Sequence, residues 1–330
     1  MRRPDLSPLA SGDLAKIASL LDRPVVAIDV GSRDGVRASW RSLGPNALLV
    51  GFDPDPEECR RLEAASADRQ GERYVPLALG AQTGPRTLHL TRDPQSSSLF
   101  APAPRALERF PELWRHEPVR TETLELSTID EWALGSGLEE LDALKVDVQG
   151  AELEVLMGTA GLLSSTRIVE AEVEFQELYT DQPLFCDVMV FMRGAGFELW
   201  RVRELHHCGL QPARRGEPVF GVGDYVERTR LGGQLAWGNA IFVRGALADA
   251  SAALDWQVRA RDACLAAAFG LPELVELGLS QALVSAPAPA AATIEEVLRR
   301  ARRRGRSRRA RDLLVRAPSH LRGFLGARLG

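Results

Sequence analysis

The feature that most constrains this chain is a short apolar run, residues 25–30, that breaks into a turn punctuated by glycines. A run of this length and composition predicts a strand buried inside a parallel sheet. Gly31 and Gly35 bracket the turn, where the absence of side chains would leave backbone N–H groups open to a ligand. Asp29 precedes the turn, at the carboxyl edge where open α/β sheets bind ligands. We therefore expect an α/β protein with a ligand site at this edge.

A second apolar run, residues 47–52, is followed by Asp53, about twenty positions after the first turn, as in dinucleotide-binding proteins. A carboxylate there can accept hydrogen bonds from both hydroxyls of a ribose. The glycine pattern, D-x-G-x-x-x-G, lacks the central glycine that lets a pyrophosphate approach the backbone. This favours S-adenosylmethionine, a nucleoside without a diphosphate, over NAD. A plain structural turn is an equally open interpretation of these two runs taken alone.

The chain has 330 residues, 45% of them hydrophobic, which is enough for one large domain with an appendage. It contains no long uninterrupted apolar run, and its first residues lack the apolar core of a signal peptide. We therefore expect a soluble, cytoplasmic protein. The four cysteines lie far apart and indicate neither a disulfide framework nor a zinc site; they are Cys59, Cys186, Cys208 and Cys264.

The net charge of −4 conceals a basic end, because residues 295–330 contain twelve arginines and three acidic residues. Three interpretations of this segment stay open: a solvated amphipathic helix, contact with an anionic membrane surface or a protein, and nucleic-acid binding. No aromatic residues alternate with the arginines to stack on bases, so nucleic acid is not expected. Its apolar side consists of Leu313, Leu314, Leu321, Phe324 and Leu325. The sequence does not predict an oligomeric state.

Apolar strands alternate with helical segments up to residue 245, which predicts a largely parallel sheet with helices on both faces. The expected strands are residues 25–30, 47–52, 74–79, 144–148, 168–175, 197–202 and 240–243, the last at the end of the segment 234–243, with further extended segments at 84–90 and 119–126. The composition then shifts to Ala, Leu and Arg, and predicts helices interrupted by a linker at residues 286–292. The expected parts are an N-terminal helical segment at 1–22, a ligand-binding domain at 23–245 and a helical, Arg-rich extension at 246–330.

The run L-K-V-D-V-Q-G-A-E-L-E-V-L at residues 144–156 resembles the signature of the FkbM family of S-adenosylmethionine-dependent methyltransferases. Four further motifs follow that family's order: D-V-G-x-x-x-G in the first turn, F-D-P after the second strand, E-V-E-F at residues 172–175, and P-L-F with G-F at 183–185 and 196–197. Together they cover about residues 25–245, and five motifs in register are a specific signal. One position departs from the pattern, since Arg33 stands where the family commonly has Asn.

The resemblance implies a class I methyltransferase (Rossmann-like) sheet of about seven strands, the last antiparallel. It also implies O-methylation of a hydroxyl on a sugar, glycan or natural product, with S-adenosylmethionine as the methyl donor. Alternatives from other classes are an NAD-binding oxidoreductase, which the missing glycine disfavours, and a non-catalytic cofactor-binding protein.

The residues expected to bind the cofactor lie in the first turn, after the second strand, beside the adenine and at the fourth strand. Asp53 is expected to bind the ribose, and Ala78 and Leu79 to flank the adenine. The full set is Asp29, Gly31, Ser32, Arg33, Gly35, Asp53, Pro54, Ala78, Leu79, Ser97 and Asp147.

Three residues are candidates for catalysis: Asp147, Glu174 and His206. Asp147 closes an apolar strand, where an unpaired buried acid is costly, so it needs either a role or a partner. That partner would be Lys145, two residues earlier, or the N-terminus of the following helix. Glu174 is a candidate to orient or deprotonate an acceptor hydroxyl.

The alternatives for the last two candidates are structural. Glu170, Glu172 and Glu174 alternate along one strand, which a solvated strand face would explain equally well. His206 suits a general base because it titrates near neutral pH, although a surface loop is the favoured interpretation of residues 206–208. No metal is expected, since no ligands have metal-binding spacing. A metal site assembled from Asp147, Glu174 and His206 stays open as an alternative. The acceptor is expected to be chosen by residues 92–119 and 203–234.

Overall fold

The computed structural model describes residues 9–209 and 233–316, with side chains of the last helix described to Arg304. The chain forms two compact units. We call the first the sheet unit; it contains Val25–Ala38 and Ala47–Gly245. The second, the helical unit, comprises the described parts of Met1–Pro24, Ser39–Asn46 and Ala246–Gly330.

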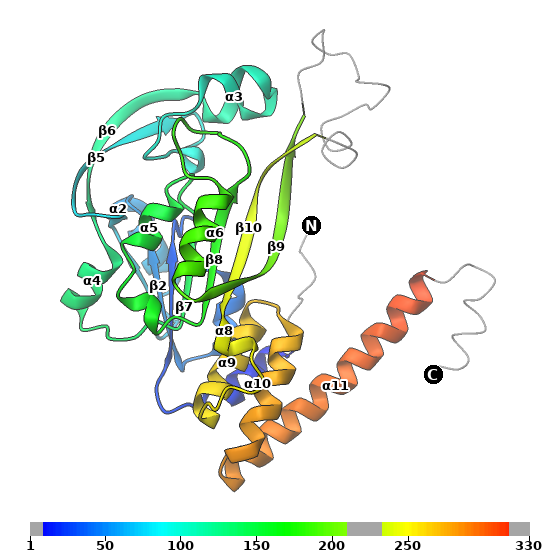
Figure 1. Ribbon diagram of the computed structural model, residues 1–330. Helices are drawn as coiled ribbons and strands as arrows, with labels where there is room; N and C mark the ends of the chain where they lie inside the picture. Colours follow the sequence, from blue (N-terminus) through cyan, green and yellow to red (C-terminus); the bar gives the residue numbers. More distant parts are fainter. Residues whose placement is uncertain (1–8, 210–232, 317–330) are drawn as a thin grey trace. The chain divides into compact units, whose positions relative to one another are not determined.

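A seven-stranded sheet in the order β3-β2-β1-β7-β8-β10-β9 forms the centre of the sheet unit (Figure 1). Its strands are β1 (Val25–Val30), β2 (Ala47–Phe52), β3 (Glu72–Val75), β7 (Ala143–Val146), β8 (Ile168–Glu174), β9 (Phe197–Cys208) and β10 (Gln234–Arg244). β10 pairs antiparallel with both β8 and β9, and the other pairs are parallel. The expected α/β fold of about seven strands, with the last antiparallel, is therefore confirmed.

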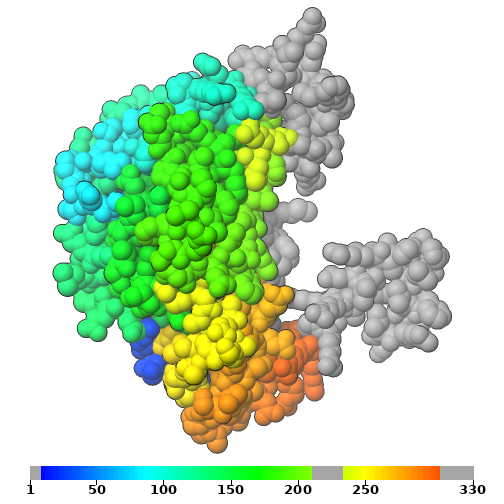
Figure 2. Space-filling view, viewed as in Figure 1, coloured from blue at the N-terminus to red at the C-terminus, as the bar shows by residue number. Residues whose placement is uncertain are grey.

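The central strands are buried on both faces, as the apolar sequence of β1 predicts for a strand inside a parallel sheet. All six residues of β1 are buried, and so are the neighbouring residues of β7 and β8 except Lys145 and Glu172. Helices α4 (Ile129–Ser136), α5 (Glu152–Met157) and α6 (Phe185–Gly194) contribute Ile129, Val155 and Met192 to the core on one face. Segments 150–200, coloured green, cover this face in the space-filling view (Figure 2).

A second, three-stranded sheet in the order β4-β6-β5 lies in the same unit. Its strands are β4 (Ala78–Leu79), β5 (Gly84–Thr91) and β6 (Pro118–Ser127). The expectation of one strand over residues 74–79 is wrong, because β3 ends at Val75 and Ala78–Leu79 pairs with Leu126–Ser127 of β6. Pro76 lies at the break, and a proline cannot donate to a sheet ladder.

The remaining segments of the sheet unit are short helices and 3₁₀ turns that connect the strands. They are α2 (Pro56–Ala65), α3 (Pro104–Arg109), η2 (Pro94–Ser96), η3 (Pro111–His116) and η4 (Leu162–Ser164). Asp55 caps α2 by accepting hydrogen bonds from the backbone N–H groups of Glu57 and Glu58. Of the two segments expected to choose the acceptor, residues 210–232 lie outside the described residues.

The helical unit contains α1 (Ser11–Ala18), most of η1 (Ala38–Leu43), α9 (Trp256–Ala268), α10 (Pro272–Ser285), α11 (Ala288–Arg316) and most of α8 (Gly245–Ala248). The expected linker at residues 286–292 is wrong, because α11 begins at Ala288. Alanine is the strongest helix former, and prolines at the start of a helix lose no intrahelical hydrogen bond. Arg300 and Arg304 of α11 form ion pairs with the buried carboxylate of Asp13.

Among the described helices, none combines the length and the apolar character that crossing a lipid bilayer requires. The side chains proposed for the apolar side of the basic segment, from Leu313 onward, lie outside the described residues.

Candidate functional site

A cavity of about 1310 Å³ opens at the carboxyl ends of the parallel strands of the sheet unit. Ten of the predicted site residues line it: Gly31, Arg33, Asp53, Pro54, Ala78, Leu79, Ser97, Asp147, Glu174 and His206. Three others, Asp29, Ser32 and Gly35, are not among the lining residues. Because strands β1, β2, β7 and β8 all end at this edge, the topology itself brings together residues that are far apart in sequence.

The glycines of the first turn serve a purpose different from the expected one. Gly31 has φ +79°, and a Cβ there would lie 1.9 Å from the carbonyl oxygen of Asp147. The N–H groups of Gly31 and Ser32 both donate to the carbonyl oxygen of Phe52, at 3.0 and 2.9 Å. These donors are therefore used within the protein, and Gly31 is needed because the ends of β1 and β7 meet so closely.

Asp29 is buried beside the cavity rather than in its wall. Its carboxylate accepts hydrogen bonds from the backbone N–H of Arg37 at 2.8 Å and from Lys145 Nζ at 3.2 Å. Burial raises the pKa of Asp29. Burial alone would lower the pKa of Lys145, but the carboxylates of Asp29 and Asp147 outweigh it and raise that pKa. Asp29 therefore affects the site indirectly, by pairing with Lys145, which stays charged and also pairs with Asp147.

Asp53 directly follows β2 and, unlike Asp29, lines the cavity. Asp53 is 4% exposed, and burial raises its pKa. Its Oδ1 accepts a hydrogen bond from the N–H of Asp55 at 2.9 Å. Arg33 lies on this side of the cavity, with Nη2 3.1 Å from Asp55 Oδ2 and Nη1 3.9 Å from Asp53 Oδ1. Within the described residues, the hydrogen bond to the Asp53 carboxylate is made at Oδ1, which leaves Oδ2 for a ligand.

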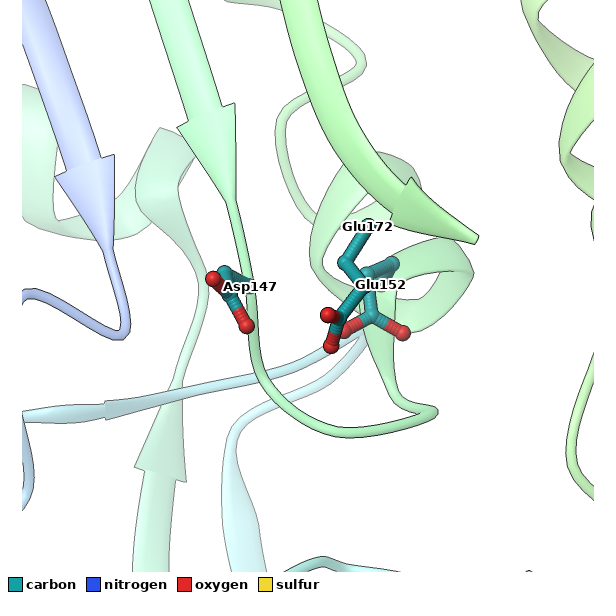
Figure 3. A group of neighbouring side chains, drawn as sticks. All are labelled: Asp147, Glu152 and Glu172. Carbon is teal, nitrogen blue, oxygen red and sulfur yellow. The ribbon is translucent and has the colours of Figure 1, made fainter. Parts of the chain in front are cut away.

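Three carboxylates, those of Asp147, Glu152 and Glu172, lie close together around the turn that follows β7 (Figure 3). Asp147 follows β7, Glu152 begins α5 and Glu172 belongs to β8; each offers one oxygen within 4.8 Å of the others. The N-terminus of α5 does not serve Asp147, as one interpretation had it. Glu152 instead accepts the N–H groups of Val148 and Gly150, at 2.7 and 2.9 Å. Such a group of carboxylate oxygens has the composition of a divalent-cation site.

Lys145 and Gln149 donate hydrogen bonds to carboxylates of this group. Lys145 Nζ lies 3.4 Å from Asp147 Oδ2, which confirms the expected Lys–Asp pair. Gln149 Nε2 donates to Asp147 Oδ1 at 3.2 Å and to Glu172 Oε2 at 2.7 Å. Gln149 has a φ of +60°, in the left-handed region that is strained for a residue with a side chain. The strained turn thus places an amide between two carboxylates.

Three glutamates at the cavity, Glu152, Glu172 and Glu174, hold protons more tightly than isolated carboxyls do. Burial raises the pKa of Glu152 to about 7, and the nearby charge of Asp147 adds to the effect. Burial, followed by the charge of neighbouring acids, raises the pKa values of Glu172 and Glu174 well above their usual range. Of these carboxyls, Glu152 can take up a proton near neutral pH.

The three alternating glutamates of β8 do not form a solvated face, so that interpretation is wrong. Glu170 and Glu174 are 1% and 3% exposed, and Glu172 is half-buried. Glu170 forms ion pairs with Arg37 and Arg203, at 2.6 and 2.5 Å. Two arginines therefore neutralise the first glutamate, whereas the other two line the cavity.

His206 belongs to strand β9, and the surface-loop interpretation is wrong. In the register of the sheet, Trp237 of β10 is the partner of both His206 on β9 and Glu174 on β8. The imidazole and indole rings stack with centroids 4.7 Å apart and planes at 8°. All three side chains line the cavity.

A serine segment and a tyrosine complete the wall near Gln149. Ser98 Oγ donates to the carbonyl oxygen of Gln149 at 2.6 Å. The hydroxyl of Tyr179 lies 2.9 Å from the carbonyl oxygen of Ser96 and 3.2 Å from Gln149 Oε1. The expected proximity of Ser97 to the site is thus explained, because its neighbours fasten the segment to the turn after β7.

Sequence reasoning missed five residues of this site: Gln149, Glu152, Glu172, Tyr179 and Trp237. Glu152 carried a signal, since an acid in the first turn of a helix after a strand is placed to accept N–H groups. Gln149 stood inside a recognised motif. Tyr179 and Trp237 gave no signal, because their proximity depends on pairing and packing across the sheet.

Comparison with known proteins is consistent with this geometry. The family described as "Methyltransferase FkbM domain" matches residues 29–199. The 2-O-methyltransferase NoeI of Sinorhizobium fredii is 30% identical over 51% of this chain and 71% of its own length. The hexuronic acid methyltransferase AglP of Haloferax volcanii is 29% identical over 44% of this chain and 54% of its own length.

Among solved structures, magnesium protoporphyrin IX methyltransferase (ChlM) from Synechocystis PCC 6803 aligns with a TM-score of 0.30 and 12% identity. The alignment covers 71% of this chain and 79% of that one. A likeness this low adds nothing to the strand order observed directly. The family match spans more than half of the chain and contains the turn after β1, Asp53, the acidic group and Glu174. On these grounds the chain belongs to the FkbM methyltransferase family.

Proposed function

We propose that this protein is an S-adenosylmethionine-dependent O-methyltransferase that acts on a hydroxyl of a sugar, in a glycan or a glycosylated natural product. The observation that carries the proposal is one cavity bounded by Asp53 at the end of β2 and by carboxylates at the ends of β7 and β8. The names of the two relatives, a 2-O-methyltransferase and a hexuronic acid methyltransferase, support a sugar hydroxyl as the acceptor.

The residues of the cavity fit S-adenosylmethionine better than NAD. Carboxylates outnumber arginines along the wall, which suits a cationic sulfonium and opposes a diphosphate. The turn at Gly31 leads into the 3₁₀ helix η1 rather than an α-helix. The helix N-terminus on which NAD enzymes bind pyrophosphate is therefore not formed by these residues.

In this proposal the two sides of the cavity have separate tasks. Asp53 Oδ2 accepts hydrogen bonds from the ribose, Pro54 borders it, and Ala78 and Leu79 flank the adenine. The turn from Asp29 to Gly35 fixes the ends of β1 and β2, and Arg33 holds Asp55 beside the ribose site. Ser97 lies on the same wall. S-adenosylmethionine would supply the methyl group as an electrophile.

The acceptor hydroxyl must lose its proton as the methyl group is transferred. Asp147 is held by Lys145 and Gln149 and is proposed to orient the acceptor and the methyl donor. Glu174, whose pKa burial raises, is proposed as the proton acceptor. His206 is the second candidate for that role, since it lines the same wall.

The first test is calorimetric titration with S-adenosylhomocysteine, with NAD as the control. We expect a micromolar dissociation constant for the former and no binding of the latter. Binding of NAD alone would favour the oxidoreductase alternative, and binding of S-adenosylhomocysteine without transfer to any sugar would favour a non-catalytic protein. Absence of both would overturn the proposal.

Two substitutions separate the tasks of the two sides. Asp53→Ala should weaken S-adenosylhomocysteine binding by about ten-fold or more, because a ribose loses a charged hydrogen-bond partner. Asp147→Asn should leave that affinity within about two-fold and lower kcat instead. Normal turnover in Asp147→Asn would remove this residue from the catalytic assignment.

A further inference from the structure

Three side chains from three neighbouring strands form a row on the wall of the cavity. Glu174 of β8, Trp237 of β10 and His206 of β9 are cross-strand partners, with Trp237 in the middle. Directly paired residues in an antiparallel ladder point to the same face of a sheet. The row therefore joins a carboxylate to two aromatic rings on one continuous surface, which lines the cavity.

The position of the row in the sheet separates it from the nucleoside side. In the order β2-β1-β7-β8-β10-β9, strand β8 lies three places from β2, and β9 lies five. At about 4.8 Å between strands, the row begins roughly 14 Å from the Asp53 edge and ends roughly 24 Å from it. A nucleoside held at Asp53 leaves this end of the cavity to a second ligand.

The two rings offer an apolar surface of defined orientation. They stack almost in parallel, and the side chain of His206 is exposed while Trp237 is half-buried. Trp237 also packs against a cluster that contains Phe110 and Tyr179, which fixes the indole. A rigid aromatic surface beside a carboxylate suits a ligand that is apolar on one face and carries hydroxyls at its edge.

We propose that Trp237 and His206 form the binding platform for the pyranose ring of the acceptor. Because the two rings cover one face of each other, the sugar ring lies with its C–H face on an outer face of the stacked pair and presents an edge hydroxyl to Glu174. This assignment rests on the proposed function and extends it, because it names the acceptor subsite and the feature of the sugar that is recognised. It gives His206 a binding role that does not require titration.

The test compares binding of methyl glucopyranoside, methyl glucuronopyranoside and the acyclic glucitol by saturation-transfer NMR, with the protein saturated with S-adenosylhomocysteine. We expect transfer to the ring protons of at least one pyranoside and much weaker transfer to glucitol. Transfer should be lost in Trp237→Leu and His206→Ala and retained in Trp237→Phe and His206→Phe. Equal transfer to glucitol, or no transfer to either pyranoside, would overturn the platform.

The same variants are then assayed for methyl transfer to the pyranoside that binds. Loss of either ring should raise the acceptor KM roughly five- to ten-fold, with kcat and S-adenosylhomocysteine affinity little changed. His206→Ala guards against misfolding, since its exposed ring supports no core. A fall in kcat that His206→Phe fails to rescue would instead make His206 the base and overturn its platform role.

Trp114, another tryptophan of the cavity wall, is the matched control. Trp114→Leu should leave the acceptor KM unchanged; a rise there with none in Trp237→Leu would place the acceptor elsewhere and overturn the inference. If wild-type protein binds S-adenosylhomocysteine and methylates a pyranoside while the ring variants behave normally, only the platform fails. If wild-type protein binds no S-adenosylhomocysteine, the proposed function itself fails.

Discussion

Gln149 connects several parts of the site, although the sequence pattern did not single it out. Its side-chain nitrogen, Nε2, donates hydrogen bonds to the carboxylates of Asp147 and Glu172. Its backbone carbonyl oxygen accepts a hydrogen bond from the Ser98 hydroxyl. Its backbone is held at φ +60°, a conformation with an energetic cost of order 1–3 kcal/mol. A strained residue that bridges two cavity carboxylates acts by positioning them, so its removal should affect turnover more than cofactor binding.

Gln149→Ala should lower kcat by roughly 10- to 100-fold, because hydrogen bonds to charged groups contribute about 1.5–3 kcal/mol each. The affinity for S-adenosylhomocysteine, measured by calorimetry, should change by less than about three-fold. Gln95→Ala is the matched control, since Gln95 also lines the cavity but donates to Asp34. Equal losses in both variants would contradict a specific role for Gln149.

Glu152 makes the stability of the protein depend on pH. Its pKa is raised from 4.5 to about 7 in the folded protein, so the folded state binds more protons than the unfolded state between these values. Stability from this group is therefore greatest at low pH and falls as pH rises through the folded pKa. His116, whose pKa burial lowers to about 4, acts in the opposite sense below pH 6.5.

Comparison with Glu152→Gln removes the contribution of His116, which is common to both proteins, and measures Glu152 together with the acids that interact with it. From pH 5 to pH 8 the free energy of unfolding of the wild type should fall by about 2 to 3 kcal/mol relative to the variant. Chemical denaturation at the two pH values measures it. A relative stability that is constant, or that rises with pH, would show that Glu152 does not carry a raised pKa.

At the scale of elements, strand β8 shows how one alternating pattern serves two purposes. Its three glutamates alternate along the strand and lie on one face of it. Glu170 forms ion pairs with two arginines, whereas Glu172 and Glu174 border the cavity. The difference follows from position along the strand, since only the carboxyl end reaches the ligand edge. Glu170 is thus a structural ion pair within a functional strand.

Glu170→Gln should lower the free energy of unfolding by about 3–5 kcal/mol, because the partly buried guanidinium groups of Arg37 and Arg203 lose their ion pairs with the Glu170 carboxylate. Glu125→Gln on β6 is the control, since it removes the same charge from an exposed strand position. Denaturant titration of both variants provides the measurement. Equal stabilities would mean that the Glu170 pairs contribute nothing to the fold.

At the scale of the whole molecule, the two units interleave along the chain. Residues of Ser39–Asn46 belong to the helical unit although the sheet unit surrounds them in sequence. Trp40 is 1% exposed, and its ring lies 5.7 Å from that of Phe269. Ser39 Oγ donates to the carbonyl oxygen of Ala268 at 2.7 Å. The proposed boundary at residue 245 therefore divides a chain whose helical unit draws on both sides of it.

A chain ending at Gly245 should unfold at a lower temperature than the full chain and bind a dye specific for exposed apolar surface. The reason is that Trp40 and Leu43 lose the helices that bury them. A chain ending at Arg304 retains α9 and α10 and is the control. Unchanged Tm in the shorter chain would show that residues 23–245 fold alone.

The sequence by itself determined the sheet and most of the ligand edge. Apolar strands alternating with helices require a parallel sheet, and acids placed just at strand ends, such as Asp53 and Asp147, must then meet at one edge. These inferences needed only local patterns and a family motif. For the same reason the family, a sheet of about seven strands with the last antiparallel, and the pair of Lys145 and Asp147 could all be anticipated.

Only the tertiary structure decided which acids are paired and which are available. The neutralisation of Glu170, the amide bridge of Gln149 and the row of Glu174, Trp237 and His206 depend on register across strands far apart in sequence. Burial then sets the protonation of Glu152, since the dielectric around a carboxyl depends on what packs against it. Neither register nor burial is written in local spacing, because both arise from contacts that form only when the whole sheet closes.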